Sequence, residues 1–374
     1  LHHLRRPIEH FPLMNPATEL SHLLIAAKLA CGSSRMKTRI RPERCRPLLL
    51  FLPIALVFGC RPENTDDSTL ILRMAHVYEV TAPTHGYGTA QLSERLRDKT
   101  EGLDLKVYPA SQLGSESELL EQLVAGELDL AISGPSFLAM WHPPIGVLDA
   151  AFVSRDLDHM LEIARSEEMA PEWDELRKRY NVRVLDTWAY GSRHLTSNRP
   201  IRHPDDLKGF RLRSPAARIF QASSEALGAS PTPIAFSEVY LALQQGIADG
   251  QENPVPVIKS MGFQEVQKCL NLTGHIQSSL QILINERTWQ RLTTDQQNIL
   301  LDTIRELGNE VYAGLIEDEK KLVDQWRRDG TIQIIEDVDV QAFRERCLKH
   351  FSTGFEFSDV YNRLTQERST EETQ

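Results

Sequence analysis

The stretch "LVAGELDLAIS", residues 123–133, has the pattern of a helix end, a glycine and the start of a buried strand. Gly126 is placed to end the helix, because glycine adopts the left-handed conformation of a C-cap without steric cost. The same spacing of leucine, glycine and aspartate returns in "LQQGIADGQEN", residues 243–253, around Gly246. Two similar helix-to-strand units indicate two similar lobes; the alternative is a short pattern that recurs by chance.

Strand and helix signals alternate around the first of these units. A short apolar run such as "LILRMAHV" favours a strand, and longer amphipathic segments favour helices. Strands interleaved with helices imply parallel sheets and an α/β fold. The expected strands are 70–77, 103–109 and 128–133, and the expected helices are near 86–100 and at 116–126.

Length and charge restrict the class of protein. A chain of 374 residues is long enough for two domains. Residues 1–59 carry nine Lys and Arg against three Asp and Glu, whereas residues 60–374 carry 33 against 49. An acidic body repels phosphate backbones, so we expect no nucleic-acid partner. Any anion that the protein binds must be captured locally.

The basic N-terminal part is typical of a targeting segment. "MKTRIRPERCRP", residues 36–47, precedes an apolar run at 48–59 that is too short to span a bilayer, for which about 20 residues are needed. We interpret residues 1–35 as an over-extended gene start, 1–59 together as extension plus signal peptide, and 60–69 as a polar tether.

The cysteines allow several interpretations. "VFGC" resembles a bacterial lipoprotein cleavage motif, which predicts lipidation of Cys60 and membrane contact through the lipid; cleavage at another small residue and a coincidental cysteine are the alternatives. Cys269 and Cys347 have no partner at metal-site or redox spacing, and a disulfide between them stays open.

The stretch "GFRLRSP", residues 209–215, places two arginines in an apolar strand. Alternation directs Arg211 and Arg213 to one face, with Phe210 and Leu212 on the other. Arg213 lies at the carboxyl end of the strand, where open α/β sheets bind ligands. Arg211 comes earlier, and we expect its head group in solvent.

Three longer blocks resemble one family. They are "RHLTSNRPIRHPDDLKGFRLRSP" (193–215), "LGASPTPIAFSEVYLALQQGIADGQENP" (227–254) and "YPASQLGSESELLEQLVAGELDLA" (108–131). Together they resemble the substrate-binding proteins of tripartite ATP-independent periplasmic (TRAP) transporters, the DctP family, over roughly residues 70–350. The resemblance implies a two-lobed periplasmic binding protein, a clamshell with a hinge and a ligand cleft between its lobes, which delivers a small organic acid to the permease membrane subunits.

The resemblance also implies ligand-binding residues. Arg213 matches the arginine that pairs with the ligand carboxylate, Arg193 a second pocket arginine, Asn253 an asparagine that holds the same carboxylate, and Phe236 an aromatic wall. A guanidinium offers a planar pair of donors that fits a carboxylate. A structural salt bridge, a solvated surface charge and a turn residue are the respective alternatives for the three polar residues.

Specificity is less clear from the sequence. Glu116 matches an acidic contact of sialic acid binders, although it could instead cap its helix after Ser115. The next acidic contact of those binders is missing, because Gly134 and Pro135 stand there. That departure argues against assuming sialic acid. A sugar acid or another hydroxylated carboxylate is one candidate ligand, and a four-carbon dicarboxylate stays open as another. Pocket or core roles are both open for His76, His85, Trp141 and Trp188.

We therefore predict a periplasmic, lipid-anchored solute receptor that needs no cofactor or metal. No complete dinucleotide, nucleophile-elbow, phosphate-loop or zinc motif supports an enzyme. The alternative function is a ligand-sensing subunit of a signalling receptor. The expected domains are lobe I at 70–190 and 279–318, lobe II at 191–278 and 319–358, and a polar tail at 359–374, with the chain crossing between lobes near residues 190 and 278.

Overall fold

The computed structural model describes residues 69–371, so the leader, Cys60 and most of the expected tether lie outside it. The strands are β1 (Leu70–Ala75), β2 (Leu103–Tyr108), β3 (Leu130–Ser133), β4 (Val182–Ser197), β5 (Arg211–Ser214), β6 (Ser230–Pro233), β7 (Gly250–Pro254), β8 (Cys269–Asn285) and β9 (Gln333–Ile335). The longer helices are α1 (Ala90–Lys99), α2 (Glu116–Ala125), α4 (Leu157–Arg165), α5 (Ala170–Tyr180), α6 (Arg218–Leu227), α11 (Thr294–Asp329), α12 (Val340–Phe351) and α13 (Ser358–Glu371). The shorter ones are the π-helical η1 (Thr84–Thr89), α3 (Pro135–Leu138), η2 (Pro143–Asp149), η3 (Pro204–Leu207), η4 (Phe236–Glu238), α7 (Val239–Gln244), α8 (Val255–Ser260), α9 (Phe263–Val266) and α10 (Glu286–Arg291).

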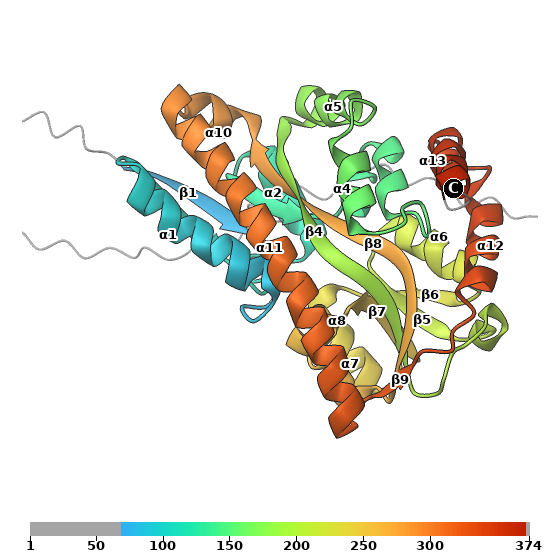
Figure 1. Ribbon diagram of the computed structural model, residues 1–374. Coiled ribbons are helices and arrows are strands. Elements are labelled where there is room, and N and C mark those ends of the chain that lie inside the picture. The colour runs from blue at the N-terminus through green and yellow to red at the C-terminus, as the bar shows by residue number, and fades with distance from the viewer. Residues whose placement is uncertain (1–68, 372–374) are drawn as a thin grey trace, which may run out of the picture. The chain divides into compact units, whose positions relative to one another are not determined.

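The strands form one sheet with two similar halves. Their order is β2-β1-β3-β8-β4-β7-β5-β6, and β9 pairs with β8. Both outer trios are parallel, as the sequence predicts, but β4 and β8 run antiparallel to each other and to their neighbours β7 and β3. The expectation of parallel sheets is thus wrong for the centre. Because β4 carries the chain from one trio to the other and β8 returns it, these strands must run in opposite directions (Figure 1).

The sequence echo at residues 123–133 and 243–253 is a structural repeat. Gly126 and Gly246 both have positive φ, at 79° and 67°. Three residues after each glycine, an aspartate binds the neighbouring strand of its trio. The Asp129 carboxylate accepts from the backbone N–H of Arg73 on β1 at 2.9 Å, and the Asp249 carboxylate accepts from the backbone N–H of Arg211 on β5 at 2.8 Å. The chance interpretation of the echo is therefore wrong.

Helix α11 runs along both halves of the sheet. With 36 residues it is about 54 Å long at 1.5 Å per residue. It packs on β4 and contacts α1 and η1 beside the first trio, and α8 and β9 beside the second (Figure 1). A buried hydrogen bond of 3.0 Å from Trp188 Nε1 to the Ile304 carbonyl oxygen fixes α11 on β4. The helix thereby connects both halves of the molecule.

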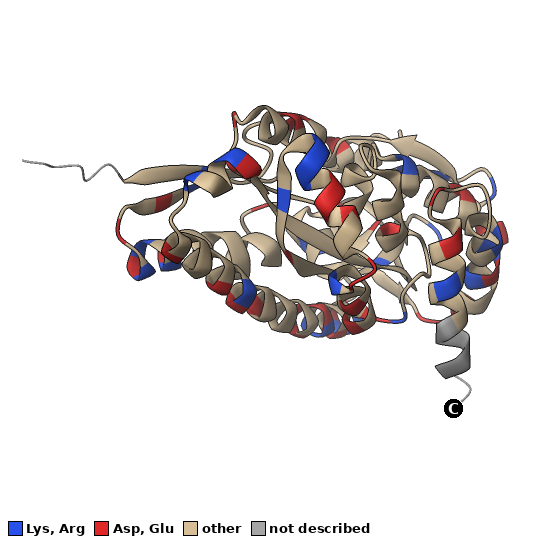
Figure 2. Ribbon diagram, turned by 90° about the horizontal axis from the view of Figure 1, so that it is seen from above, with Lys and Arg blue, Asp and Glu red and all other residues tan. Residues whose placement is uncertain are grey.

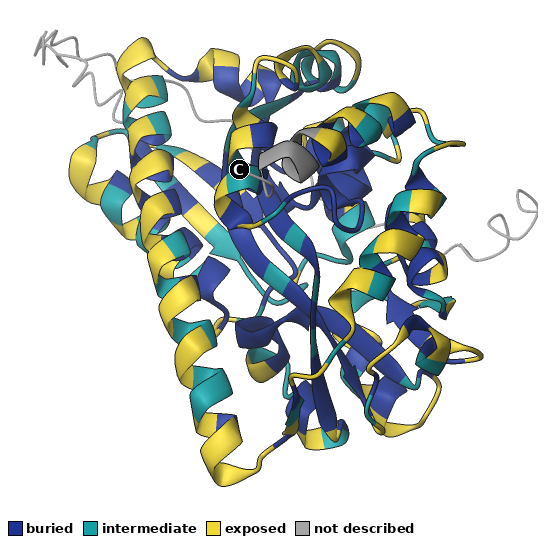
Figure 3. Cartoon of the chain, turned by 45° about the vertical axis from the view of Figure 1, so that its right-hand side comes forward, coloured by how far each residue is buried: buried dark blue, intermediate teal, exposed yellow. Residues whose placement is uncertain are grey.

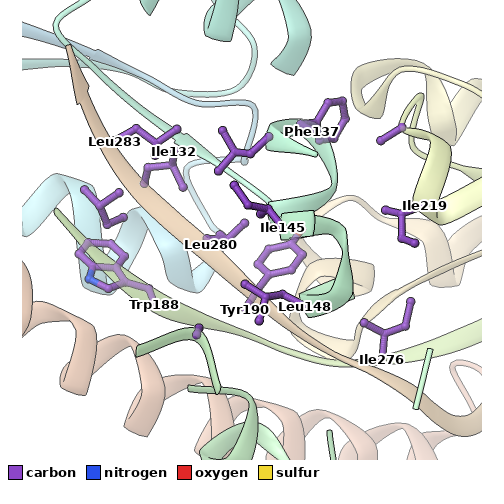
Figure 4. Close-up of a cluster of buried hydrophobic side chains, with 14 of the residues drawn as sticks. Ile132, Phe137, Ile145, Leu148, Trp188, Tyr190, Ile219, Ile276, Leu280 and Leu283 are labelled. Carbon is purple, nitrogen blue, oxygen red and sulfur yellow. The ribbon is translucent and has the colours of Figure 1, made fainter. Parts of the chain in front are cut away.

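The core lies on both faces of the sheet. Burial concentrates on the central strands, while the outer faces of the helices are exposed (Figure 3). Around β4 and β8, Trp188, Tyr190, Leu280 and Leu283 pack with side chains from β3, α3 and η2 (Figure 4). The long strands β4 and β8 are therefore buried through most of their length, and they bury polar side chains such as Arg193 and His275 together with apolar ones.

The C-terminal segment forms a helix where we expected a polar tail at 359–374. In α13, Tyr361 is fully buried and its hydroxyl donates to the Ala151 carbonyl oxygen at 2.8 Å. Cys269 and Cys347 are both buried and free. Lys and Arg are interspersed with Asp and Glu over the outer helices (Figure 2). Between residues 69 and 371, no helix combines the length and apolar character needed to cross a bilayer.

Candidate ligand-binding site

A cavity of about 150 Å³ lies where both halves of the sheet meet the central strands. Its wall comes from the C-terminal ends of β1, β3, β5 and β7, from the N-terminus of α2, and from β4 and β8. Carboxyl ends of strands are where open α/β sheets bind ligands. The lining includes Val77, Tyr78, Glu116, Gly134, Phe137, Asp149, Tyr190, Arg193, Arg213, Phe220, Phe236, Asn253, Ser278 and Leu280.

All five residues predicted from the sequence line this one cavity. Arg213, Arg193, Asn253, Phe236 and Glu116 lie on β5, β4, β7, η4 and α2 respectively. They are up to 137 positions apart between Glu116 and Asn253 in the chain, and the fold brings them together. Their roles in ligand binding stay predictions.

Arg213 is a buried cation without an ion-pairing carboxylate. Only 1% of the residue is exposed, and Nε and Nη2 donate to the Ile234 carbonyl oxygen at 3.1 and 2.8 Å. No Asp or Glu within residues 69–366 forms an ion pair with it. Burial, partly offset by nearby Glu252, lowers the pKa of Arg213 to about 10, so the group is charged at neutral pH. Its remaining donors are available to an anion in the cavity. Arg211, by contrast, is exposed and pairs with Asp249 at 2.6 Å, as expected for a head group in solvent.

Arg193 is neutralised by the protein itself. Its Nε contacts Glu252 Oε2, and its Nη2 donates to Glu252 Oε1 at 2.7 Å and to the Glu252 carbonyl oxygen at 2.9 Å. Nε2 of buried His275 lies 3.6 Å from Glu252 Oε2. Burial alone would raise the pKa of Glu252, but Arg193 and His275 lower it to about 2. Glu252 was missed by the sequence analysis, although it directly precedes Asn253 in "QENP".

Asn253 and Phe236 line the same cavity as Arg213. Asn253 is 1% exposed, and its Nδ2 donates to Gln251 Oε1 at 2.6 Å, which fixes the carboxamide at the end of β7. The Phe236 ring centroid is 5.9 Å from the Arg213 guanidinium carbon and 6.2 Å from the Tyr78 ring centroid. An aromatic ring beside a guanidinium restricts its orientation and excludes water. Both residues thus shape the surroundings of the free cation.

Glu116 faces the cavity and does not cap α2. The capping carboxylate is Glu118, whose Oε2 accepts from the Ser115 N–H at 2.7 Å and from Ser115 Oγ at 2.8 Å. Glu116 Oε1 instead accepts from Ser133 Oγ at 2.7 Å and from the Gly134 N–H at 2.9 Å. Burial raises the pKa of Glu116 to about 7.

A second acidic side chain, Asp149, lines the cavity and was missed. It ends η2, is 1% exposed, and its Oδ2 accepts from the Ser136 N–H at 2.9 Å and from Ser136 Oγ. A Cβ atom on Gly134 would lie 3.7 Å from this oxygen. Burial raises the pKa of Asp149 to about 6. Its signal in the sequence is a single acid inside the apolar run at 145–153.

The histidines and tryptophans named in the sequence analysis do not line the cavity. His76 is buried with Nε2 3.0 Å from Thr89 Oγ1, next to His85. Trp141 stacks on Tyr180 with ring centroids 5.3 Å apart, and Trp188 Nε1 donates a hydrogen bond to the Ile304 carbonyl oxygen of α11. For these residues the core or packing interpretation holds in the structure.

The chain matches a known family over most of the described range. Residues 74–355 match the model of the bacterial extracellular solute-binding proteins, family 7. The sialic acid-binding periplasmic protein SiaP of Vibrio cholerae is 37% identical over 261 residues, which are 69% of this chain and 81% of SiaP. The 2,3-diketo-L-gulonate-binding periplasmic protein YiaO of Escherichia coli is 32% identical over 275 residues, 70% of this chain and 82% of YiaO.

A solved structure has the same architecture. The TRAP periplasmic solute-binding protein from Roseobacter denitrificans with bound L-galactonate superposes with a TM-score of 0.74 at 32% identity, covering 79% of this chain and 99% of that protein. The two-lobed α/β binding-protein fold and the family expected from the sequence are thereby confirmed.

Proposed function

This chain belongs to the bacterial extracellular solute-binding proteins of family 7, and from that premise we propose that it captures a small organic acid through Arg213 and delivers it to the membrane subunits of a TRAP transporter. Its relatives are periplasmic solute-binding proteins of transporters. The protein is accordingly a periplasmic binding protein and not an enzyme. The ligand, the residues that hold it and the delivery step are the proposed parts.

The buried, unpaired guanidinium of Arg213 is the observation that carries this proposal. A buried charge is unfavourable unless it is paired. The protein pairs Arg193 with Glu252 but provides Arg213 with only the Ile234 carbonyl oxygen. A ligand carboxylate would complete the pairing, and the fixed plane of the guanidinium would orient it. We assign Asn253 as a further donor to the same carboxylate, with Phe236, Arg193 and Glu116 in the surrounding wall.

The expected mechanism is closure of two lobes on the ligand. The cavity is lined from both trios, so a ligand that contacts both favours the closed state by its differential affinity. We propose that the lobes move about β4 and β8 near residues 190 and 278. There the pairing of β4 with β8 is irregular between Ala189 and Gly191, and Gly191, opposite Ser278, has φ 125°. Such a position tolerates bending better than a regular ladder.

The protein is also proposed to be held at the membrane by a lipid on Cys60. The argument is the "VFGC" motif, which lies outside the described residues. One acyl chain gives marginal membrane binding but raises the local concentration near a permease. Mass spectrometry of the mature protein tests this, since an acylated Cys60 N-terminus has a distinct mass.

A thermal-shift screen of the purified protein tests the proposed function. The panel contains uronates, aldonates, sialic acid, four-carbon dicarboxylates, keto acids and sulfonates. A ligand that binds only the native state must raise the melting temperature. We expect one class of carboxylate to do so in the wild type. If no acid of the panel raises the melting temperature of the folded protein, the proposal is contradicted, and a sensor of another ligand is favoured.

A further inference from the structure

We propose that Asp149, together with Glu116, makes the cavity select a monocarboxylate that carries hydroxyl groups and reject a dicarboxylate. This inference rests on the proposed function and concerns the part of the ligand that Arg213 does not hold. It assigns a specificity-determining role to Asp149, whose carboxyl group reaches the cavity from η2.

The two carboxyl groups are held in the same way. Each has one oxygen fixed by a backbone N–H and a serine hydroxyl: Oε1 of Glu116 by Gly134 and Ser133, and Oδ2 of Asp149 by Ser136. The other oxygen of each group, Oε2 of Glu116 and Oδ1 of Asp149, has no hydrogen-bond partner within residues 69–366. Both carboxyls are therefore oriented, and each offers one free acceptor in the wall of the cavity.

Among residues 69–366 no cation forms an ion pair with Glu116 or Asp149, although Arg213 and Arg193 lie near enough to act electrostatically on them. Glu116 and Asp149 belong to the half of the molecule with β1, β2 and β3, whereas Arg213 belongs to β5 in the other half. Arg193 also lines the cavity, but its charge is paired with Glu252. A ligand that bridges the cavity thus meets one available positive charge on one side and two acidic groups on the other.

Hydroxyl groups are the ligand chemistry that fits the acidic side. A ligand O–H donates to a carboxylate oxygen in a short, charge-assisted hydrogen bond. At pH 8, where Glu116 and Asp149 are charged, a second ligand carboxylate has no proton to donate and would be repelled, more strongly in a cavity than in water. The buried hydroxyl of Ser278, which lines the same cavity, also lacks a hydrogen-bond partner among the described residues. It supplies a third polar group for a hydroxylated chain.

A matched pair of acids isolates this effect. L-galactonate and galactarate share one six-carbon hydroxylated skeleton, and they differ at C6, which is CH₂OH in the first and carboxylate in the second. D-gluconate and D-glucarate form an equivalent pair. Dissociation constants of all four, measured by calorimetry at pH 8, give the preference for monocarboxylate over dicarboxylate. We expect the better-bound monocarboxylate to bind at least tenfold more tightly than its partner.

The variants Asp149→Asn and Glu116→Gln then test the assignment to these residues. In each, the amide oxygen can keep the bonds to the backbone N–H and the serine, so the amide NH₂ group takes the place of the free oxygen. An acceptor becomes a donor, and we expect the preference to narrow by tenfold or more. Glu118→Gln on the same helix is the control, because Glu118 is exposed and lies outside this cavity; it should leave the preference unchanged.

The outcomes separate this inference from the proposed function. It is overturned if a dicarboxylate binds as tightly as its partner, if the best ligand of the full panel is a dicarboxylate or lacks hydroxyl groups, or if neither amide variant alters the preference. In those cases capture by Arg213 stands. If no organic acid binds the folded wild type, the proposed function fails, and the inference fails with it. The two variants are independent, so one poorly folding variant leaves the other as the test.

Discussion

Replacing Arg213 by alanine should weaken binding of the captured acid strongly and specifically. Nε and Nη2 of Arg213 both donate to one acceptor, the Ile234 carbonyl oxygen. This occupies one edge of the guanidinium and leaves the edge formed by Nη1 and the second N–H of Nη2. That edge carries two parallel donors, which match both oxygens of a carboxylate.

The expected loss follows from burial. Arg213 is 1% exposed, so its partner carboxylate would also be removed from water. Truncating one partner of a buried, hydrogen-bonded charge pair costs roughly 2–5 kcal/mol, because the other charge is left buried and unpaired. At about 1.4 kcal/mol for each factor of ten, Arg213→Ala should raise the dissociation constant roughly thirty-fold to several thousand-fold. Arg213→Lys keeps the charge but not the paired donors, and should lie between the wild type and alanine.

Calorimetric titration with the best acid of the panel measures these losses. The matched control is Arg211→Ala, two residues away on β5, because Arg211 is exposed and pairs with Asp249 outside the cavity. It should change the dissociation constant less than threefold. If Arg213→Ala also changes it less than threefold while remaining folded, Arg213 does not hold the carboxylate, and the reasoning from its unpaired charge is refuted.

Three further predictions concern the charges of the cavity. Glu252→Gln should lower the free energy of unfolding by about 3–5 kcal/mol in urea titrations, because Arg193 stays buried without its partner. Glu317→Gln, in the exposed pair with Lys321, should change the free energy of unfolding far less, because solvent screens that pair. Equal small effects of the two substitutions would contradict a buried ion pair. The raised pKa of Asp149, about 6 against an ordinary 3.8, means that the folded state holds this proton more tightly, so its contribution to stability is present below pH 4 and is lost as the pH rises through 6. Between pH 4 and pH 8, the free energy of unfolding of Asp149→Asn should therefore rise by up to about 3 kcal/mol relative to that of the wild type, at about 1.4 kcal/mol per pKa unit. If the difference in free energy of unfolding between variant and wild type does not change with pH, the carboxyl of Asp149 is not buried as described. Glu116 and Asp149 become neutral below pH 6, whereas Arg193, Arg213 and Glu252 keep their charge between pH 8 and pH 5. The preference for L-galactonate over galactarate should therefore shrink from pH 8 to pH 5 in the wild type. In the double variant Glu116→Gln and Asp149→Asn, the preference should not change over this range.

The candidate site was only partly predictable from the sequence. Arg213 could be placed because strand alternation and the following proline locate it at a strand end, and the resemblance to a family added Arg193, Asn253, Phe236 and Glu116. Glu252 and Asp149 were not predicted, although Glu252 directly precedes Asn253 and Asp149 is a single acid in an apolar run. Their importance depends on contacts with Arg193 and Ser136, 59 and 13 residues away, which no local pattern encodes.

Local sequence patterns were sufficient to predict several elements and the repeat. Apolar periodicity, a glycine at each helix end and the recurring Leu-x-x-Gly-x-x-Asp pattern depend on neighbouring residues, so they predict β1 to β3, α1, α2 and the two matching units. The antiparallel centre, the helix at the C-terminus and the pairing of the cavity charges became clear only from the folded chain. Whether an arginine is free or paired, and whether a carboxyl is held by one oxygen or both, depends on which distant groups lie within about 3 Å of it, and that is set by packing of the whole chain.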